Sequence, residues 1–178
     1  SLNIKISKNA ILIINVEDKN ITNLNIPIFA YNKEINNKAL LLYNDYFLLY
    51  NKIFKLFNHD IKEFDTEFNN KKNKIIFIGD NNSKIRFNIC NKYKDNINTL
   101  FKLLNKDQIE YNNSNDIFSN RLSLKEQLIY KYQLCIDGHG TSFNRFPWQL
   151  KSNSLVFKID SNLIEWYYPF IESCYIKC

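Results

Sequence analysis

The stretch KIIFIGD, residues 74–80, decides the fold of this 178-residue chain. It is a short, isoleucine-rich apolar run, which is typical of a strand buried on both faces. Gly79 allows a tight turn after the run, and the pattern of residues 83–92 favours a helix. A strand, a glycine turn and a helix in this order form one half of a Rossmann-like unit.

The segments on either side extend this alternation. Short apolar runs predict strands at residues 10–16, 26–31, 39–43, 132–136 and 155–158. Helices are expected at residues 46–57, 95–104, 124–130, 142–151 and 163–168, with Ser123 and Gln127 as the cap of the third. Residues 58–74 are expected to be a polar connector, and residues 105–121 are too rich in Asn and Asp to assign. The alternation predicts an α/β fold with a mostly parallel sheet.

The length of the chain accommodates one compact domain or two tightly packed lobes. The chain contains no Met and begins with Ser1, so we expect a processed chain or a piece of a larger protein. No apolar run reaches the roughly 18 residues that a membrane span needs. We therefore expect a soluble domain without a membrane span or signal peptide, in either a cytoplasmic or a luminal compartment.

The positive charge of the chain is spread out. The formal net charge is +6, and all but three of the 24 basic residues are lysines distributed along the sequence. A nucleic-acid-binding domain usually gathers Arg and Lys on one face, so this distribution argues against nucleic acid as a partner. The scarcity of arginine makes Arg86, Arg121 and Arg145 candidates for a specific role.

The four cysteines, Cys90, Cys135, Cys174 and Cys178, include no Cys-x-x-Cys pair and have no His at ligand spacing. This pattern argues against a zinc site. A disulfide between two of these cysteines is an alternative if the chain is luminal or secreted. Cys135, however, lies in an apolar run and is expected to be a small buried side chain.

Three turns that follow predicted strands are candidate ligand sites, because ligands of open α/β sheets bind beyond the carboxyl ends of the strands. They are residues 17–18, 79–80 and 137–145. In the third, Gly138 and Gly140 let the backbone approach a ligand, Ser142 offers a hydroxyl and a free N–H at a helix start, and Arg145 adds a forked cation. That set suits a diphosphate. The alternative is a tight turn whose glycines serve only the backbone geometry.

Each of the other candidate site residues has both a possible functional role and a purely structural alternative. Asp18 is either a catalytic base or an acidic residue that ends a strand, and His139 is either an acid, base or sugar contact or a polar surface residue. Arg86 reaches phosphates from a second side or lies on a solvated helix face. The aromatic residues Trp148, Trp166, Tyr167 and Tyr168 stack on a base or sugar, or belong to the core.

One long segment resembles a known family. Residues 130–158, YKYQLCIDGHGTSFNRFPWQLKSNSLVFK, followed by EWYYP at residues 165–169, are similar to the hallmark of glycosyltransferase family 90. This family includes protein O-glucosyltransferases, capsule-associated enzymes and lipopolysaccharide-modifying enzymes. PIFAYNK at residues 27–33 resembles its Pro-Val-Phe-x-x-x-Lys element, and IFIG at residues 76–79 with Arg86 resembles its Phe-Arg-Gly block. The resemblance runs from about Ile11 and is weakest over residues 105–121.

The resemblance implies a GT-B-like enzyme with two Rossmann-type lobes, here residues 1–70 on the acceptor side and residues 71–178 for the donor. It implies that Asp18 deprotonates an acceptor hydroxyl, which attacks the anomeric carbon with inversion. Ser142 and Arg145 would hold the diphosphate of a UDP-sugar, with Arg86 opposite and Asp137, Gly138 and Gly140 completing the donor site. The expected donor is UDP-glucose or a relative, the acceptor is a protein or glycan, and no metal or other cofactor is expected.

Two departures from the family pattern keep alternatives open. Ile78 replaces the Arg of Phe-Arg-Gly, which removes one cation near the donor. The chain also ends at Cys178, where family members continue, so we expect a minimal enzyme or an excerpt. The alternatives are a non-catalytic nucleotide-sugar- or carbohydrate-binding remnant of the same fold, or a basic nucleic-acid-binding domain.

Overall fold

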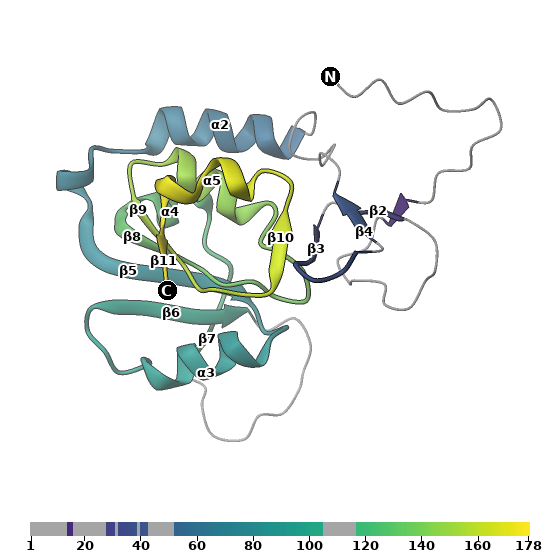
Figure 1. Ribbon diagram of the computed structural model, residues 1–178. Coiled ribbons are helices and arrows are strands. Elements are labelled where there is room, and N and C mark those ends of the chain that lie inside the picture. Colours follow the sequence, from purple (N-terminus) through teal and green to yellow (C-terminus); the bar gives the residue numbers. More distant parts are fainter. Residues whose placement is uncertain (1–13, 16–27, 31, 39, 43–51, 105–116) are drawn as a thin grey trace.

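The main body of the protein is a six-stranded sheet in which every neighbouring pair of strands is parallel (Figure 1). The computed structural model describes residues 14–15, 28–30, 32–38, 40–42, 52–104 and 117–178. The strand order is β11-β9-β8-β5-β6-β7. The strands are β5 (Lys72–Asp80), β6 (Thr99–Leu104), β7 (Phe118–Ser119), β8 (Tyr130–Cys135), β9 (Leu155–Lys158) and β11 (Ile176–Lys177).

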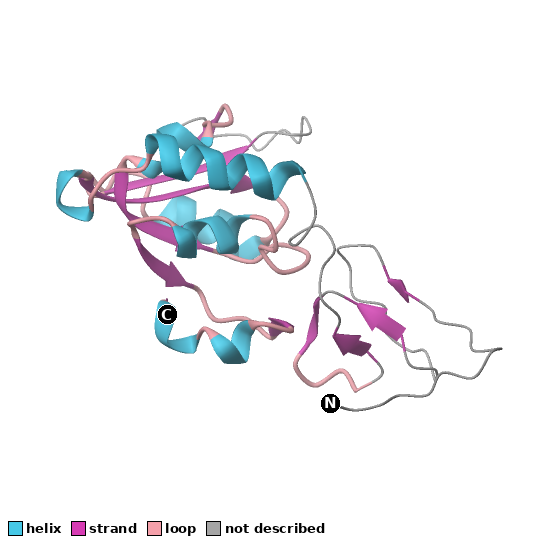
Figure 2. Ribbon diagram, turned by 90° about the horizontal axis from the view of Figure 1, so that it is seen from above, coloured by secondary structure: helices cyan, strands magenta, loops and turns pink. Residues whose placement is uncertain are grey.

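Helices cover both faces of this sheet (Figures 1 and 2). Helix α3 (Lys84–Lys92) lies on one face, and α2 (Lys52–Phe64), α4 (Leu124–Leu128) and α5 (Arg145–Lys151) lie on the other. The layered arrangement confirms the predicted α/β class and is consistent with a Rossmann-like fold. None of the helices described is both long and apolar enough to cross a bilayer.

Strand β5 is the centre of the core, because its alternate side chains point to opposite faces of the sheet. Phe77 packs toward α3 with Cys90 and Leu103, while Ile76 and Ile78 pack on the opposite face. All five side chains are buried. Burial on both faces explains why the stretch reads as a continuous apolar run. The predicted strand and helix are confirmed, but Gly79 lies within β5, paired with Leu103, rather than in a turn after the strand.

The predicted connector at residues 58–74 is wrong in its first part, because α2 continues to Phe64. Ile61 and Phe64 pack against Leu124, Leu128 and Trp148, so the helix is bound to α4 and α5 through an apolar face. The charged residues between them lie on the other side of an amphipathic helix, a pattern that resembles a polar linker when it is read one residue at a time.

A smaller part of the chain forms two short sheets (Figure 1). Strands β1 (Ile14–Asn15), β2 (Ile28–Ala30) and β4 (Leu40–Leu42) are parallel in the order β1-β2-β4, which confirms strands within the predicted segments. Strand β3 (Asn32–Glu34) pairs antiparallel with β10 (Leu163–Glu165). Short 3-10 turns follow at η1 (Phe68–Asn70), η3 (Tyr168–Phe170) and η4 (Glu172–Cys174).

Two predicted helices are wrong. Residues 95–104 contain β6, whose Phe101 and Leu103 enter the core beside β5, and the pairing with a central strand decides its conformation. Residues 163–168 contain β10, which is held by its pairing with β3. In both cases a long-range partner overrides the local pattern.

The observed starts of three helices differ in detail from the predicted ones. Ser83, expected as the first residue of the helix, is instead the N-cap of α3 and accepts a hydrogen bond from the backbone N–H of Arg86. Ser123 caps α4, but its partner is Glu126 in a reciprocal capping box rather than Gln127. Helix α5 begins at Arg145, three residues later than predicted.

Candidate functional site

The candidate site lies where the sheet changes the direction of its winding. From β5 the chain crosses to β6 and β7 on one side, and then returns to β8 on the other side of β5. The connections use α3 on one face of the sheet and α4 on the other (Figure 1). The residues at the end of β5 and in the turn after β8 line one crevice. Ligands of open α/β sheets bind at such a switch point.

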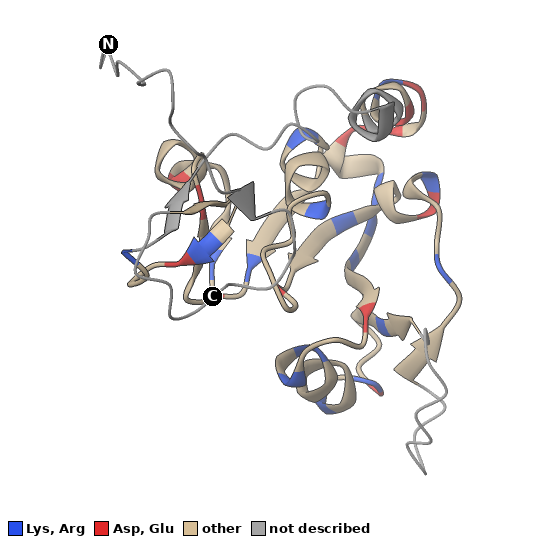
Figure 3. Cartoon of the chain, turned by 90° about the vertical axis from the view of Figure 1, so that its right-hand side faces the viewer, with Lys and Arg blue, Asp and Glu red and all other residues tan. Residues whose placement is uncertain are grey.

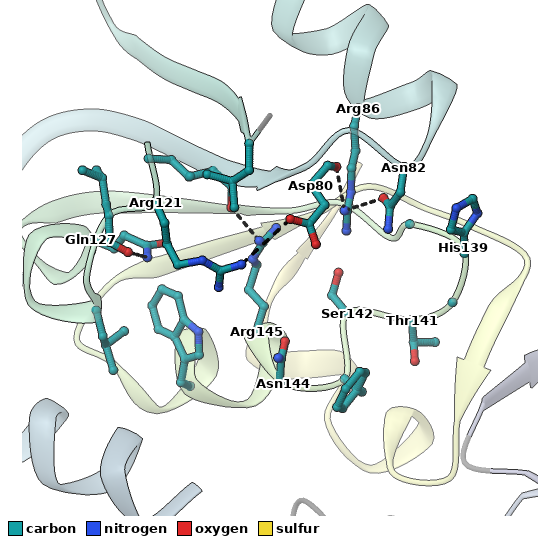
Figure 4. Close-up of a pocket in the computed structure, with 18 of the residues that line it drawn as sticks. Asp80, Asn82, Arg86, Arg121, Gln127, His139, Thr141, Ser142, Asn144 and Arg145 are labelled. Carbon is teal, nitrogen blue, oxygen red and sulfur yellow. Dashed lines mark hydrogen bonds and ion pairs between the residues drawn. The ribbon is translucent and has the colours of Figure 1, made fainter. Parts of the chain in front are cut away.

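A pocket of about 490 Å³ opens at this crevice (Figure 4). It is lined by the end of β5, the start of α3, the end of β6, residues 121–124 and 127, and the turn at residues 138–145. Arg86, Arg121 and Arg145, which are all the arginines of the chain, line this one pocket. The described lining contains no lysine. Basic residues, Lys and Arg together, are spread over helices, strands and loops (Figure 3).

Arg86 is a buried cross-link between β5 and β8. Its Nε and Nη2 donate to the carbonyl oxygen of Ile136 at 3.1 and 2.7 Å. Its Nη1 donates to the carbonyl oxygen of Asp80 at 3.1 Å and to Oδ1 of Asn82 at 2.7 Å. The predicted solvated helix face is therefore excluded, and most of the donors of Arg86 hold the two strand ends together.

Arg145 crosses the same crevice from α5. Its Nη2 donates to the carbonyl oxygen of Ile78 at 2.5 Å, and its guanidinium lies over the Phe77 ring, 4.9 Å from the centroid. Gly79 makes room for it, because a Cβ at this position would lie 2.9 Å from Nη1. Nη1 is buried and has no hydrogen-bond partner in the described part of the chain. Arg145 therefore keeps a donor available beside the pocket.

The turn after β8 is organised by a buried carboxylate. Oδ1 of Asp137 accepts from the backbone N–H of Ser142 at 2.9 Å, and its Oδ2 accepts from Lys158 Nζ at 2.7 Å and Ser161 Oγ at 2.6 Å. The hydroxyl of Ser142 donates to the carbonyl oxygen of Ile136 at 2.9 Å. The expectation of a free N–H at Ser142 is therefore wrong, because the N–H closes the turn on Asp137.

Gly138 lets the turn pack closely against Asn82. The N–H of Gly138 donates to the carbonyl oxygen of Gly140 at 3.0 Å. A Cβ on Gly138 would meet the side-chain amide of Asn82 at 2.6 Å. Gly138 and Gly140 both line the pocket, and so does the exposed His139. The turn therefore presents backbone and small side chains to the pocket.

The electrostatics of the pocket favour an anion. Its described lining carries the three arginines and one acid, Asp80, which gives a net charge of +2. Burial, together with the positive charge of Arg86, lowers the pKa of Arg145 to about 10. Burial also lowers the pKa of Arg86. Closely spaced, partly desolvated cations repel one another, so a bound anion stabilises the charged form of each.

The other predicted site residues lie in different places. Asp18 falls outside the described residues. Trp148 is buried in the α2 cluster and also lines the pocket, whereas Trp166 and Tyr168 line a second pocket of about 250 Å³ beside β10. Tyr167 packs edge-on between Trp166 and Tyr168.

The sequence matches the model of glycosyl transferase family 90 over residues 10–175. The chain belongs to this family. The match spans almost the whole chain and includes every described segment that lines the arginine pocket. No curated protein matches the sequence in a direct comparison. Membership in glycosyl transferase family 90 implies a sugar donor and an acceptor, and the suspected family is confirmed.

The sequence did not predict the residues that bind and orient the side chains of the site. Lys158 and Ser161 neutralise and orient Asp137, and Asn82 orients Arg86. The position of Lys158 at the end of an apolar strand was a usable signal, because a lysine buried there requires a carboxylate partner. Nothing in the sequence pattern joins Asn82 to Arg86 beyond their spacing of four residues.

Proposed function

We propose that the chain transfers a sugar from a UDP-sugar, such as UDP-glucose or a related hexose or pentose donor, to a hydroxyl of a protein or glycan with inversion. The arginine pocket is the donor site in this proposal. The observation that carries it is the convergence of all three arginines on one pocket at the switch point of the sheet. The proposed overall arrangement is GT-B-like, with residues 1–70 on the acceptor side and residues 71–178 for the donor.

Diphosphate is the group that the pocket suits best. Its charge matches the net +2 of the described lining, and guanidinium groups form paired hydrogen bonds with phosphate oxygens. Nη1 of Arg145 is a buried donor without a described partner, so a phosphate oxygen would satisfy a group that otherwise costs about 1–3 kcal/mol. Gly138 and Gly140 both line the pocket, so the backbone of the turn lies beside the place proposed for the same group.

The individual residues have different proposed roles. Arg145 contacts the diphosphate and stabilises the charge that grows on UDP as the glycosidic bond to the donor breaks. Arg86 adds positive charge while it fixes the strand ends, and Ser142 lines the pocket while its hydroxyl donates to the carbonyl oxygen of Ile136. Asp137 acts through Ser142, whose N–H it holds. In this scheme the guanidinium groups supply the charge that a metal ion supplies in other transferases.

Asp18 is the proposed base, and this role comes from the family resemblance. Its carboxylate would take the proton from the acceptor hydroxyl as that oxygen attacks the anomeric carbon from the side opposite the UDP. The bond from the anomeric carbon to the diphosphate breaks as the new bond forms, so the configuration inverts. The proton then rests on Asp18 and the negative charge on UDP.

The test is UDP release from a panel of UDP-sugars in the presence of protein and glycan acceptors, for the wild type and Asp18→Asn. We expect release with at least one donor and a loss of at least about a hundredfold in Asp18→Asn, the scale of general-base catalysis. The matched control is Asp95→Asn, which changes an exposed acid outside the pocket and should leave release unchanged.

Donor binding separates transfer from simple binding. The midpoint of thermal unfolding should rise with UDP and UDP-sugars in both the wild type and Asp18→Asn, because a ligand at 100 times its Kd adds about 2.7 kcal/mol. Stabilisation without UDP release from any donor would replace the transferase proposal with the non-catalytic binding remnant. If no UDP-sugar stabilises the protein, both readings fail.

A further inference from the structure

The three arginines of the pocket differ in how many of their donors are already used. Arg86 has donors on all three guanidinium nitrogens bound to Ile136, Asp80 and Asn82. Arg145 uses Nη2 on Ile78. Arg121 has one ion pair of 3.9 Å between its Nη2 and Oδ1 of Asp80, and 71% of its side chain is exposed. It is the arginine best able to turn toward a ligand.

The backbone beneath Arg121 is nevertheless fixed. Leu122 packs against the cluster around Ile78 and Leu104, and its carbonyl oxygen accepts from Nε2 of Gln127 at 3.0 Å. Ser123 begins the capping box of α4. A long cation on a rigid base loses little backbone entropy when it engages a ligand, so its position at the pocket rim is suited to binding.

Asp80 stands between this cation and the others. It lies at the end of β5, lines the pocket, and its Oδ1 faces Arg121 (Figure 4). An ion pair of 3.9 Å with an exposed partner is weak and can exchange for a stronger contact. A diphosphate offers Arg121 more charge and several acceptor oxygens, whereas the carboxylate of Asp80 repels the same ligand.

We propose that Arg121 binds the diphosphate directly and that Asp80 is its counter-ion in the free pocket, from which the diphosphate displaces it. The ligand class in this inference rests on the proposed function. Asp80 then lowers the affinity of the site for anions, in that it competes for Arg121 and repels the ligand. The pair sets how tightly the donor and the released UDP are held.

The test measures the affinity of the whole chain for inorganic pyrophosphate and for UDP by titration calorimetry. In Arg121→Ala we expect both affinities to fall about ten- to a hundredfold, the loss typical of a charge-assisted hydrogen bond. Arg121→Lys should fall in between, because it keeps the charge and loses the fork. The matched control, Lys84→Ala, removes an equal charge from an exposed residue of α3 outside the pocket and should change affinity less than twofold.

Asp80→Asn should raise the affinity for pyrophosphate, whereas Arg121→Ala should lower it. Removing a carboxylate that lines the pocket should tighten pyrophosphate binding roughly three- to tenfold. In the Arg121→Ala background the gain should be smaller, because the competition for Arg121 is gone and only repulsion remains. The midpoint of urea unfolding should be unchanged in Arg121→Ala, which distinguishes a lost ligand contact from a damaged fold.

The outcomes separate this inference from the proposed function. Unchanged pyrophosphate and UDP affinity in Arg121→Ala overturns the inference, even if UDP-sugars are turned over. No measurable pyrophosphate binding to the wild type also overturns it. Pyrophosphate binding that depends on Arg121, in a chain that releases no UDP and binds no UDP-sugar, supports the inference and overturns the proposed function.

Discussion

Asp137→Asn should destabilise the protein by about 3 kcal/mol, because it leaves the Lys158 ammonium buried without its negative partner. The Asp137 and Lys158 side chains are 4% and 6% exposed, with 2.7 Å between Oδ2 and Nζ. Removing one member of a buried pair costs about 3–5 kcal/mol. The lower end applies, because Asn can still accept from Ser142 and the rings of Phe146 and Tyr168 lie 5.5 and 5.4 Å from the ammonium. Such a loss is a large share of the free energy of unfolding of a typical protein, which is about 5–15 kcal/mol.

The assay is urea unfolding followed by far-ultraviolet circular dichroism. Lys158→Met in the Asp137→Asn background should recover at least about 2 kcal/mol, because it removes the stranded charge. Asp160→Asn is the matched control: its ion pair with Lys177 is exposed, and the cost should stay below about 1 kcal/mol. A cost below about 1 kcal/mol in Asp137→Asn, or no recovery with Lys158→Met, would refute the assignment of Asp137 as the anchor of the turn.

Two further predictions concern the pocket and the core. Gly79→Ala places a Cβ 2.9–3.0 Å from both terminal nitrogens of Arg145, so the guanidinium should move away from the carbonyl oxygen of Ile78. The affinity for pyrophosphate should then fall about tenfold. An unchanged affinity measured by calorimetry would contradict this. In the native protein at pH 8 a thiol reagent should modify Cys174 and Cys178 quickly and the other two cysteines only after denaturation. The reason is that burial raises the pKa of those two thiols to about 12 and about 11, and rapid labelling of all four would show that the core is open.

The parts of the fold that could be predicted are those in which a local pattern and a long-range contact agree. The run at residues 74–80 is apolar because both faces of β5 are covered, so its pattern and its environment carry the same information. The segments at residues 95–104 and 163–168 are short and mixed in pattern, and pairing with β5 and β3 decides their conformation. Pairing partners of this kind cannot be read from a local window.

In the candidate site too, local sequence patterns predicted some features, and others depend on contacts between distant segments. Glycines after a predicted strand and a scarce arginine drew attention to the turn at residues 137–145, and Ser142 and Arg145 of this turn line the pocket. The donors and acceptors that these side chains use could not be predicted, because they come from distant segments. The carbonyl oxygen of Ile136 accepts from both Arg86 and Ser142, and Asp137 is held by Lys158 from β9. These contacts depend on how three strand ends meet.

The central claim, that the arginine pocket binds the diphosphate of a sugar donor, can be tested by nuclear magnetic resonance on protein labelled with ¹⁵N-arginine. The chain contains three arginines, so the Nε–Hε spectrum should contain three signals, each assigned by substitution. On titration with UDP-glucose or UDP, the signals of Arg121 and Arg145 should shift in a saturable manner. The signal of Arg86, whose Nε is bound to Ile136, should move least. Saturable binding of the nucleotide with all three signals unmoved would contradict the account.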